Sequence, residues 1–169
     1  LLNDTNEIGT LSRIYRGGAL SIYDKDSENN GLSINSSVSE GTNANAVKIE
    51  TLGALNHGGN SIYGQGVTLS GASITGSGTI QSNGADLVLR ANGGDITLTG
   101  NYYTYGTNNE LIIQGANNVQ LGNYTRVDSS ALDLGTLGTS GVVAGSQAVS
   151  GASNLTLTSG MVTLTNGQQ

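Results

Sequence analysis

Three acidic side chains form the densest carboxylate cluster of the sequence: Asp24, Asp26 and Glu28. Acids at alternate positions are typical of the opening of a calcium-binding loop, whose oxygens converge on one hard cation. Two residues depart from that loop, because Asn29 stands where it requires glycine and Asn35 where its closing glutamate belongs. A solvent-exposed turn explains the cluster as well. We predict no metal site, and the sequence leaves open whether these three acids hold an ion.

The chain has one histidine, His57, and no cysteine. A zinc site needs several His, Cys or acidic ligands, and covalent catalysis needs a nucleophile beside an oriented base. No G-x-S-x-G motif supplies such a nucleophile. We therefore predict that His57 is a loop residue, or one member of a three-fold ring if the chain trimerises.

Two pairs of aspartates are candidates for glycoside hydrolysis, which needs two carboxyl groups about 5 to 10 Å apart. They are Asp86 with Asp95, and Asp128 with Asp133. Nothing in the sequence distinguishes these four residues from ordinary turn residues. The sequence therefore predicts that the chain is not an enzyme and uses no cofactor.

Four of the seven tyrosines lie close together in the sequence: Tyr102, Tyr103 and Tyr105, followed by Tyr124. Exposed aromatic rings beside Asn and Asp can stack on sugar rings, so these tyrosines are candidates for contact with a host-surface glycan. Tyrosine is also enriched where subunits meet. Contact between subunits is therefore the alternative prediction for the same four residues.

The composition excludes several classes of protein. Six basic and twelve acidic residues give a net charge of −6, which argues against a nucleic-acid partner because phosphates are bound by clustered Lys and Arg. No segment approaches the roughly 20 apolar residues that a membrane-spanning helix requires, so we predict no membrane insertion. Gly, Asn, Ser and Thr make up 83 of the 169 residues, and there is no Phe, Trp, Pro or Cys.

A short motif recurs along the chain, in which two aliphatic residues flank a single residue and Gly, Asn, Asp or Ser lie close on either side. This alternation places both aliphatic side chains on one face of a strand, so each copy predicts a short β-strand. One segment, 43–55, could form a short helix, but Val47 and Ile49 match the motif and favour a strand. The eleven copies are 18–24, 30–36, 45–51, 65–71, 85–93, 94–100, 109–115, 117–122, 130–135, 153–160 and 160–167.

The 40 Leu, Ile and Val residues provide a thin core for 169 residues. Successive motifs are unevenly spaced, closest between Leu155 and Val162 and furthest apart between Val47 and Val67, whereas a solenoid keeps a nearly constant period. We therefore predict an all-β, elongated fibrous homotrimer with essentially no helix. Its short strands would form an intertwined, β-prism or β-helical shaft, and its core would close only between chains.

The chain is expected to have three parts. Residues 1–65, where the repeat is less regular, form an irregular N-terminal β-region that could act as an adaptor, and residues 66–133 form a β-repeat shaft. Charge separates the third part, because all 18 charged residues lie within residues 1–133. Residues 134–169 contain no charged residue. Strand edges are normally protected by charges or proline, so this last part is expected to pair with identical chains or to continue into further structure beyond residue 169.

Three segments carry a resemblance to a known class of protein: GASITGSGTI, NGADLVLRANGGDITLTGN and SNLTLTSGMVTL. In their style of repeat they resemble the shaft regions of bacteriophage tail fibres, and the resemblance covers most of residues 66–169. It implies a parallel homotrimer on the virion that is joined to other tail proteins and acts in host-cell attachment. Bacterial adhesins use similar Gly/Asn/Thr-rich repeats. A single-chain β-solenoid on the bacterial cell surface is therefore the alternative.

Overall fold

A computed structural model describes residues 8–14, 17–25, 30–38, 45–106, 109–127, 155–157 and 161–163. Within these residues the chain forms β-strands and no helix, so the predicted all-β class is confirmed. The strands are β1 (Thr10–Leu11), β2 (Leu20–Asp24), β3 (Leu32–Ile34), β4 (Val47–Thr51), β5 (Leu55–Asn56), β6 (Ile62–Gly64), β7 (Val67–Gly71), β8 (Ile74–Gly76), β9 (Ile80–Ser82), β10 (Leu87–Ala91), β11 (Ile96–Tyr105), β12 (Leu111–Gln114), β13 (Asn118–Val127), β14 (Leu155–Leu157) and β15 (Met161–Thr163).

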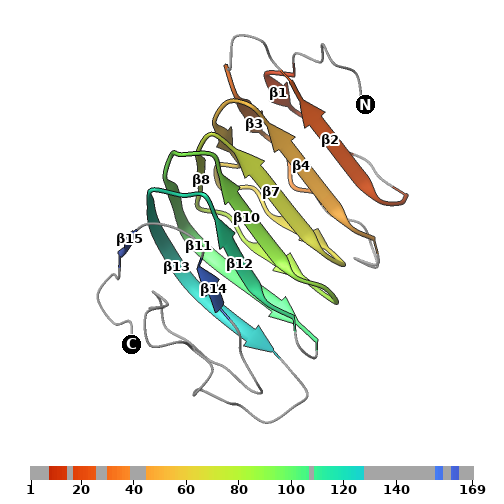
Figure 1. The fold of residues 1–169 in the computed structure, drawn as a ribbon. Coiled ribbons are helices and arrows are strands. Elements are labelled where there is room, and N and C mark those ends of the chain that lie inside the picture. Colours follow the sequence, from red (N-terminus) through yellow and green to blue (C-terminus); the bar gives the residue numbers. More distant parts are fainter. Residues whose placement is uncertain are drawn as a thin grey trace.

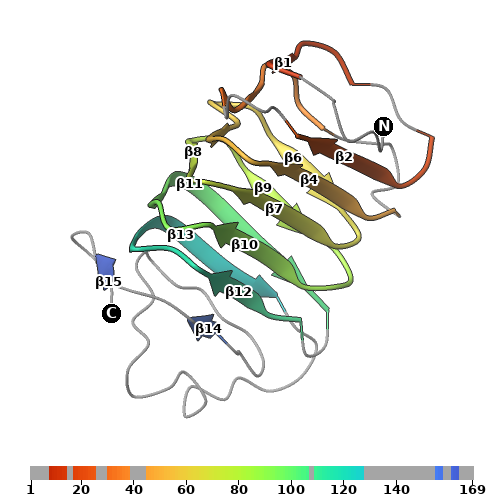
Figure 2. The same cartoon turned by 45° about the horizontal axis from the view of Figure 1, so that its top comes forward.

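The strands wind into a parallel β-solenoid of about five turns. The first sheet contains β2, β4, β7, β10, β12 and β14, which pair in this order (Figure 1). The second sheet contains β1, β3, β5, β8, β11, β13 and β15, and β6 and β9 extend it along the second half of β11 (Figure 2). Strands that are neighbours in either sheet run parallel and come from successive turns.

Equivalent positions in the first sheet recur at similar intervals in the middle of the chain. Val47 pairs with Val67, Val67 with Leu87 and Leu87 with Leu111, so the first two intervals are equal and the third is slightly longer. The intervals at the two ends, from Leu20 to Val47 and from Leu111 to Leu155, are longer. The strands stack in register despite this variation, so the argument from uneven spacing against a solenoid is wrong, and the β-helical form among the predicted alternatives is confirmed. The most closely spaced motifs belong to opposite sheets: Leu155 lies in β14 of the first sheet and Val162 in β15 of the second.

Ten of the eleven motifs coincide with strands, and the eleventh, 130–135, lies outside the described residues. The motif does not mark the short strands β5, β6, β8 and β9. Each of them carries one inward aliphatic residue, and its second inward position, two residues later, is His57, Gly64, Gly76 or Ser82. A search for paired aliphatics cannot detect such strands, although they complete each turn.

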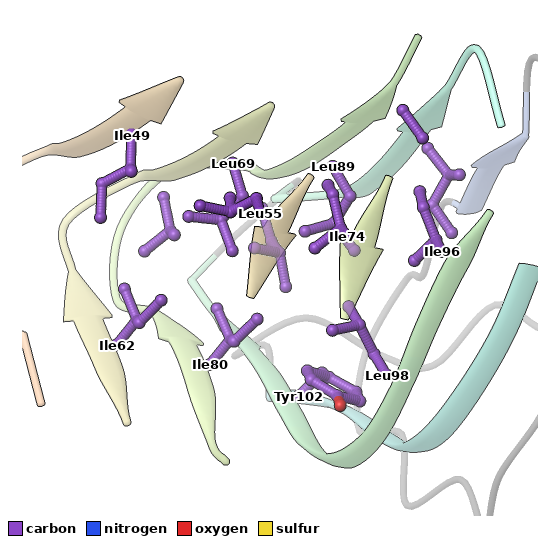
Figure 3. Close-up of a cluster of buried hydrophobic side chains, with 14 of the residues drawn as sticks. Ile49, Leu55, Ile62, Leu69, Ile74, Ile80, Leu89, Ile96, Leu98 and Tyr102 are labelled. Carbon is purple, nitrogen blue, oxygen red and sulfur yellow. The ribbon is translucent and has the colours of Figure 1, made fainter. Parts of the chain in front are cut away.

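A continuous apolar core fills the space between the sheets of a single chain. Figure 3 shows side chains from β4, β7 and β10 meeting those from β5, β6, β8, β9 and β11. The inward side chains of the two sheets face one another and belong to one cluster that runs through successive turns, so one or two aliphatics per strand suffice. The expectation that the core closes only between chains is therefore wrong. Its members are Ile22, Leu32, Ile34, Val38, Val47, Ile49, Leu55, Ile62, Val67, Leu69, Ile74, Ile80, Leu87, Leu89, Ala91, Ile96, Leu98, Tyr102, Leu111, Ile113, Ala116, Val119, Leu121 and Tyr124.

The predicted boundary at residue 65 falls inside this architecture, because β4 and β7 on either side of it are paired neighbours in the first sheet. The predicted boundary at residue 133 lies outside the described residues, and so does most of 134–169. The division into three parts stays a prediction.

Candidate functional site

The four clustered tyrosines separate onto opposite faces of the second sheet. Tyr102 of β11 and Tyr124 of β13 are in-register neighbours, and both side chains are buried in the core. The Tyr102 hydroxyl accepts a hydrogen bond from the Gly100 N–H at 2.7 Å, and the Tyr124 hydroxyl lies 2.7 Å from Thr104 Oγ1. Burial raises the pKa of Tyr102. These two side chains lie where neither a glycan nor a second chain reaches them, which corrects the prediction for them.

Tyr103 and Tyr105 alternate with the inward residues of β11 and therefore lie on the outer surface. Tyr103 is in register with Gln81 of β9, which is in register with Tyr63 of β6. Asn83 follows β9 and lies beside this column, where its Oδ1 accepts a hydrogen bond from Gln81 Nε2 at 2.5 Å. We call these five partly exposed residues, Tyr63, Gln81, Asn83, Tyr103 and Tyr105, the tyrosine–amide face.

A column of glycines forms the bend that separates this face from the rest of the second sheet. Gly78, Gly100 and Gly122 follow one another at equal intervals, one per turn. The backbones approach so closely here that a Cβ on Gly100 would lie 2.1 Å from the Gly78 carbonyl oxygen, and one on Gly122 would lie 2.3 Å from that of Gly100. The β11–β13 pairing shifts register at the same place, between Leu98 and Asn101. Residues beyond the bend therefore face a different direction.

Asp86 and Asp95 connect successive turns. Asp86 Oδ1 accepts a hydrogen bond from the Glu110 N–H at 2.9 Å. Asp95 Oδ1 accepts one from the Asn118 N–H at 3.1 Å and one from Asn118 Nδ2 at 2.9 Å. Both partners lie one turn further along the chain, so these carboxylates stabilise the stacking of the turns. The other candidate pair, Asp128 and Asp133, lies outside the described residues.

Asp24 is buried at the end of β2. Its Oδ1 accepts a hydrogen bond from the Ile8 N–H at 2.7 Å, and its Oδ2 accepts one from the Thr51 hydroxyl at 2.9 Å. The carboxylate thus joins the first described segment to β4. Asp26 and Glu28 are not among the described residues, and no group of three potential metal ligands occurs within the part that is described.

His57 is a loop residue, as predicted, but its side chain is buried in the core of one chain. Its Nδ1–H donates to the Asn60 carbonyl oxygen at 2.9 Å, and the ring lies over Gly76 of the next turn, where a Cβ would lie 2.1 Å from Nε2. Nε2 has no hydrogen-bond partner among the described residues. A ring of histidines from three chains is incompatible with this position.

Comparison of the chain with protein-family models, with curated proteins and with solved structures gave no match. Within the described residues, no helix is present that could cross a membrane. The surface that remains as a candidate site is the tyrosine–amide face, since the described aspartates and His57 are occupied in holding the turns together.

Burial lowers the pKa of His57, and the hydrogen bond to Asn60 opposes this only in part. The unfolded chain, with a pKa of 6.5, therefore takes up a proton on acidification before the folded chain does. We expect stability to be constant above that pH and to fall below it by up to about 1.4 kcal/mol per pH unit, until the pH reaches the folded-state pKa. Urea unfolding between pH 7.5 and 5 measures this dependence. His57→Gln should remove it, and an unchanged dependence in that variant would contradict the assignment.

Proposed function

We propose that the chain is a non-enzymatic structural segment of an extracellular attachment fibre, which holds binding sites at a distance from the surface that carries them. The supporting observation is that successive turns pair in the same order in both sheets around one continuous core. Neighbouring strands lie about 4.8 Å apart. Each further turn therefore lengthens the fibre by that amount without changing its cross-section.

The closed core favours a bacterial surface adhesin built from one chain. From β3 to β12 the inward aliphatic residues are buried almost completely within a single protomer, and Leu52 is the exposed large apolar residue among those described. This part of the solenoid needs no second chain to bury its inward apolar residues. This function is the one that the geometry supports best.

The virion tail fibre is the second candidate, and one feature of the surface favours it. Val88 of β10 and Ile112 of β12 lie side by side on the outer face of the first sheet, and both are partly exposed. An apolar pair at this position would be covered if three chains packed along a common axis. In that arrangement each protomer would be a β-helical shaft with its own core.

Light scattering of the purified chain distinguishes the two candidates. We expect a single species with the 17.1 kDa mass of one chain. A species of three times that mass, which persists in mild denaturant, would contradict the single-chain adhesin and support the virion fibre. Antibodies against the chain should label the surface of intact producing cells. Labelling of virions alone would also contradict the adhesin.

A further inference from the structure

We propose that the tyrosine–amide face is a binding site for an uncharged, extended glycan. This inference goes beyond the structural role, because it assigns a binding activity to the fibre segment itself. It rests on the outer residues of β6, β9 and β11, strands that are anchored in the core by inward residues such as Ile62, Ile80 and Tyr102.

The spacing of the face suits a chain of sugar rings. Tyr63, Gln81 and Tyr103 occupy one column, with one residue from each of three successive turns. The two aromatic rings are thus separated by two strand spacings, about 9 to 10 Å, with an amide between them. Two successive units of an extended polysaccharide span a comparable length. Its rings can stack on the tyrosines while its hydroxyl groups reach the amide.

The side chains of the face are already ordered relative to one another. The rings of Tyr103 and Tyr105 are stacked, with their centroids 6.1 Å apart and their planes at 29°. Gln81 and Asn83 are joined by their side-chain hydrogen bond. Tyrosine provides a large contact area for the loss of few rotatable bonds. Binding therefore costs little conformational entropy on the protein side.

The absence of charge selects the class of glycan. The outward positions of β6, β9 and β11 carry no charged side chain. The outer face of the first sheet is different, with Lys48 and Glu50 in an ion pair on β4 and Arg90 on β10. An acidic polysaccharide would find no cation on the tyrosine–amide face to pair with its carboxylates or sulfates. An uncharged glycan has no charge that needs such a partner, so it can bind this face without an unpaired charge.

Affinity electrophoresis in native gels tests the proposal, since the chain has a net charge of −6 and migrates readily. Gels containing hydroxyethylcellulose, mannan or galactomannan are compared with gels containing alginate and with empty gels. We expect at least one uncharged polysaccharide to retard the chain and alginate to have no effect. Replacing both Tyr103 and Tyr105 by alanine should weaken the interaction at least about fivefold, as for aromatic residues at the centre of a contact.

Two matched variants serve as controls. Tyr23→Ala removes a partly exposed tyrosine from β2 in the first sheet and should leave the retardation unchanged. Tyr103→Phe combined with Tyr105→Phe keeps both rings and should preserve most of the retardation. The unfolding midpoint of each variant establishes that it is folded.

Four results would overturn the proposal: no retardation by any uncharged polysaccharide, retardation by alginate alone, equal binding by the double alanine variant, or an equal loss in Tyr23→Ala. A fifth result would also overturn it, by showing that a protein chain and not a glycan occupies the tyrosine–amide face. If the wild type is a multimer and the double alanine variant a monomer, a second copy of the chain covers this face instead. The mass measurement tests the structural role separately, so failure of the glycan site leaves that role standing.

Discussion

Replacing Gly100 by alanine should lower the free energy of unfolding by about 3 kcal/mol, the upper end of the usual cost of overpacking. The added Cβ would lie 2.1 Å from the Gly78 carbonyl oxygen and 2.5 Å from that of Ser77. Both contacts are with backbone of the preceding turn, so no side chain can rotate away to relieve them. The strands must separate locally, which also disturbs the hydrogen bond from the Gly100 N–H to Tyr102.

Urea unfolding monitored by circular dichroism measures this loss, and Gly59→Ala is the matched control. Gly59 also lies on the second sheet's side of the solenoid, between β5 and β6, but the atom nearest to its added Cβ is Ser77 Oγ, at 3.9 Å. We expect its stability to remain within about 0.5 kcal/mol of the wild type. Similar stabilities for the Gly100 and Gly59 variants would refute the close approach of the turns at this bend.

Deleting residues 86–109 should give a folded protein that is one turn shorter. The deletion removes β10 and β11 together, so that β7 pairs with β12 and Val67 precedes Leu111 by the same interval by which it now precedes Leu87. At a stability of roughly 0.05 to 0.15 kcal/mol per residue, the loss of this segment should reduce the free energy of unfolding by about 1 to 4 kcal/mol. The remaining turns should still unfold cooperatively, as expected for stacked repeats.

Deleting residues 86–95 removes β10 alone and serves as the out-of-phase control. It places β11 where the first sheet needs a strand, and every later strand then lies on the wrong sheet. We expect this shorter deletion to abolish the folded structure, as measured by circular dichroism and by resistance to protease. If both deletions fold equally well, or neither folds, the turn is not the structural unit and the proposed role as an extensible spacer loses its basis.

The sequence predicted strands well because alternation is a local property. Val47 and Ile49, or Leu87 and Leu89, alternate within one strand whatever lies beside it. The regular period of the solenoid was missed because it is a property of strand pairs. Leu87 must be compared with Leu111, which lies in the same sheet, and not with Ile96 of the next motif, which lies in the other. Nothing in the local pattern says which sheet a strand joins.

The inward direction of Tyr102 and Tyr124 was also missed, although a signal was present. Gly-Asn-Tyr occurs at 100–102 and again at 122–124, and this repetition indicates equivalent positions in successive turns. What could not be predicted is that the hydroxyls find partners inside the core, at Gly100 and Thr104. Without such partners, burying two tyrosines would be unfavourable.

The imidazole of His57 occupies the space above Gly76, and Leu98 is the inward residue of the turn that follows. The large side chain of His57 in one turn thus fits because residue 76 in the next turn has no side chain. Substitutions at positions 57 and 76 should therefore be tolerated in pairs. Enlarging residue 76 alone should be harmful, whereas the same change should be accepted once residue 57 has become small.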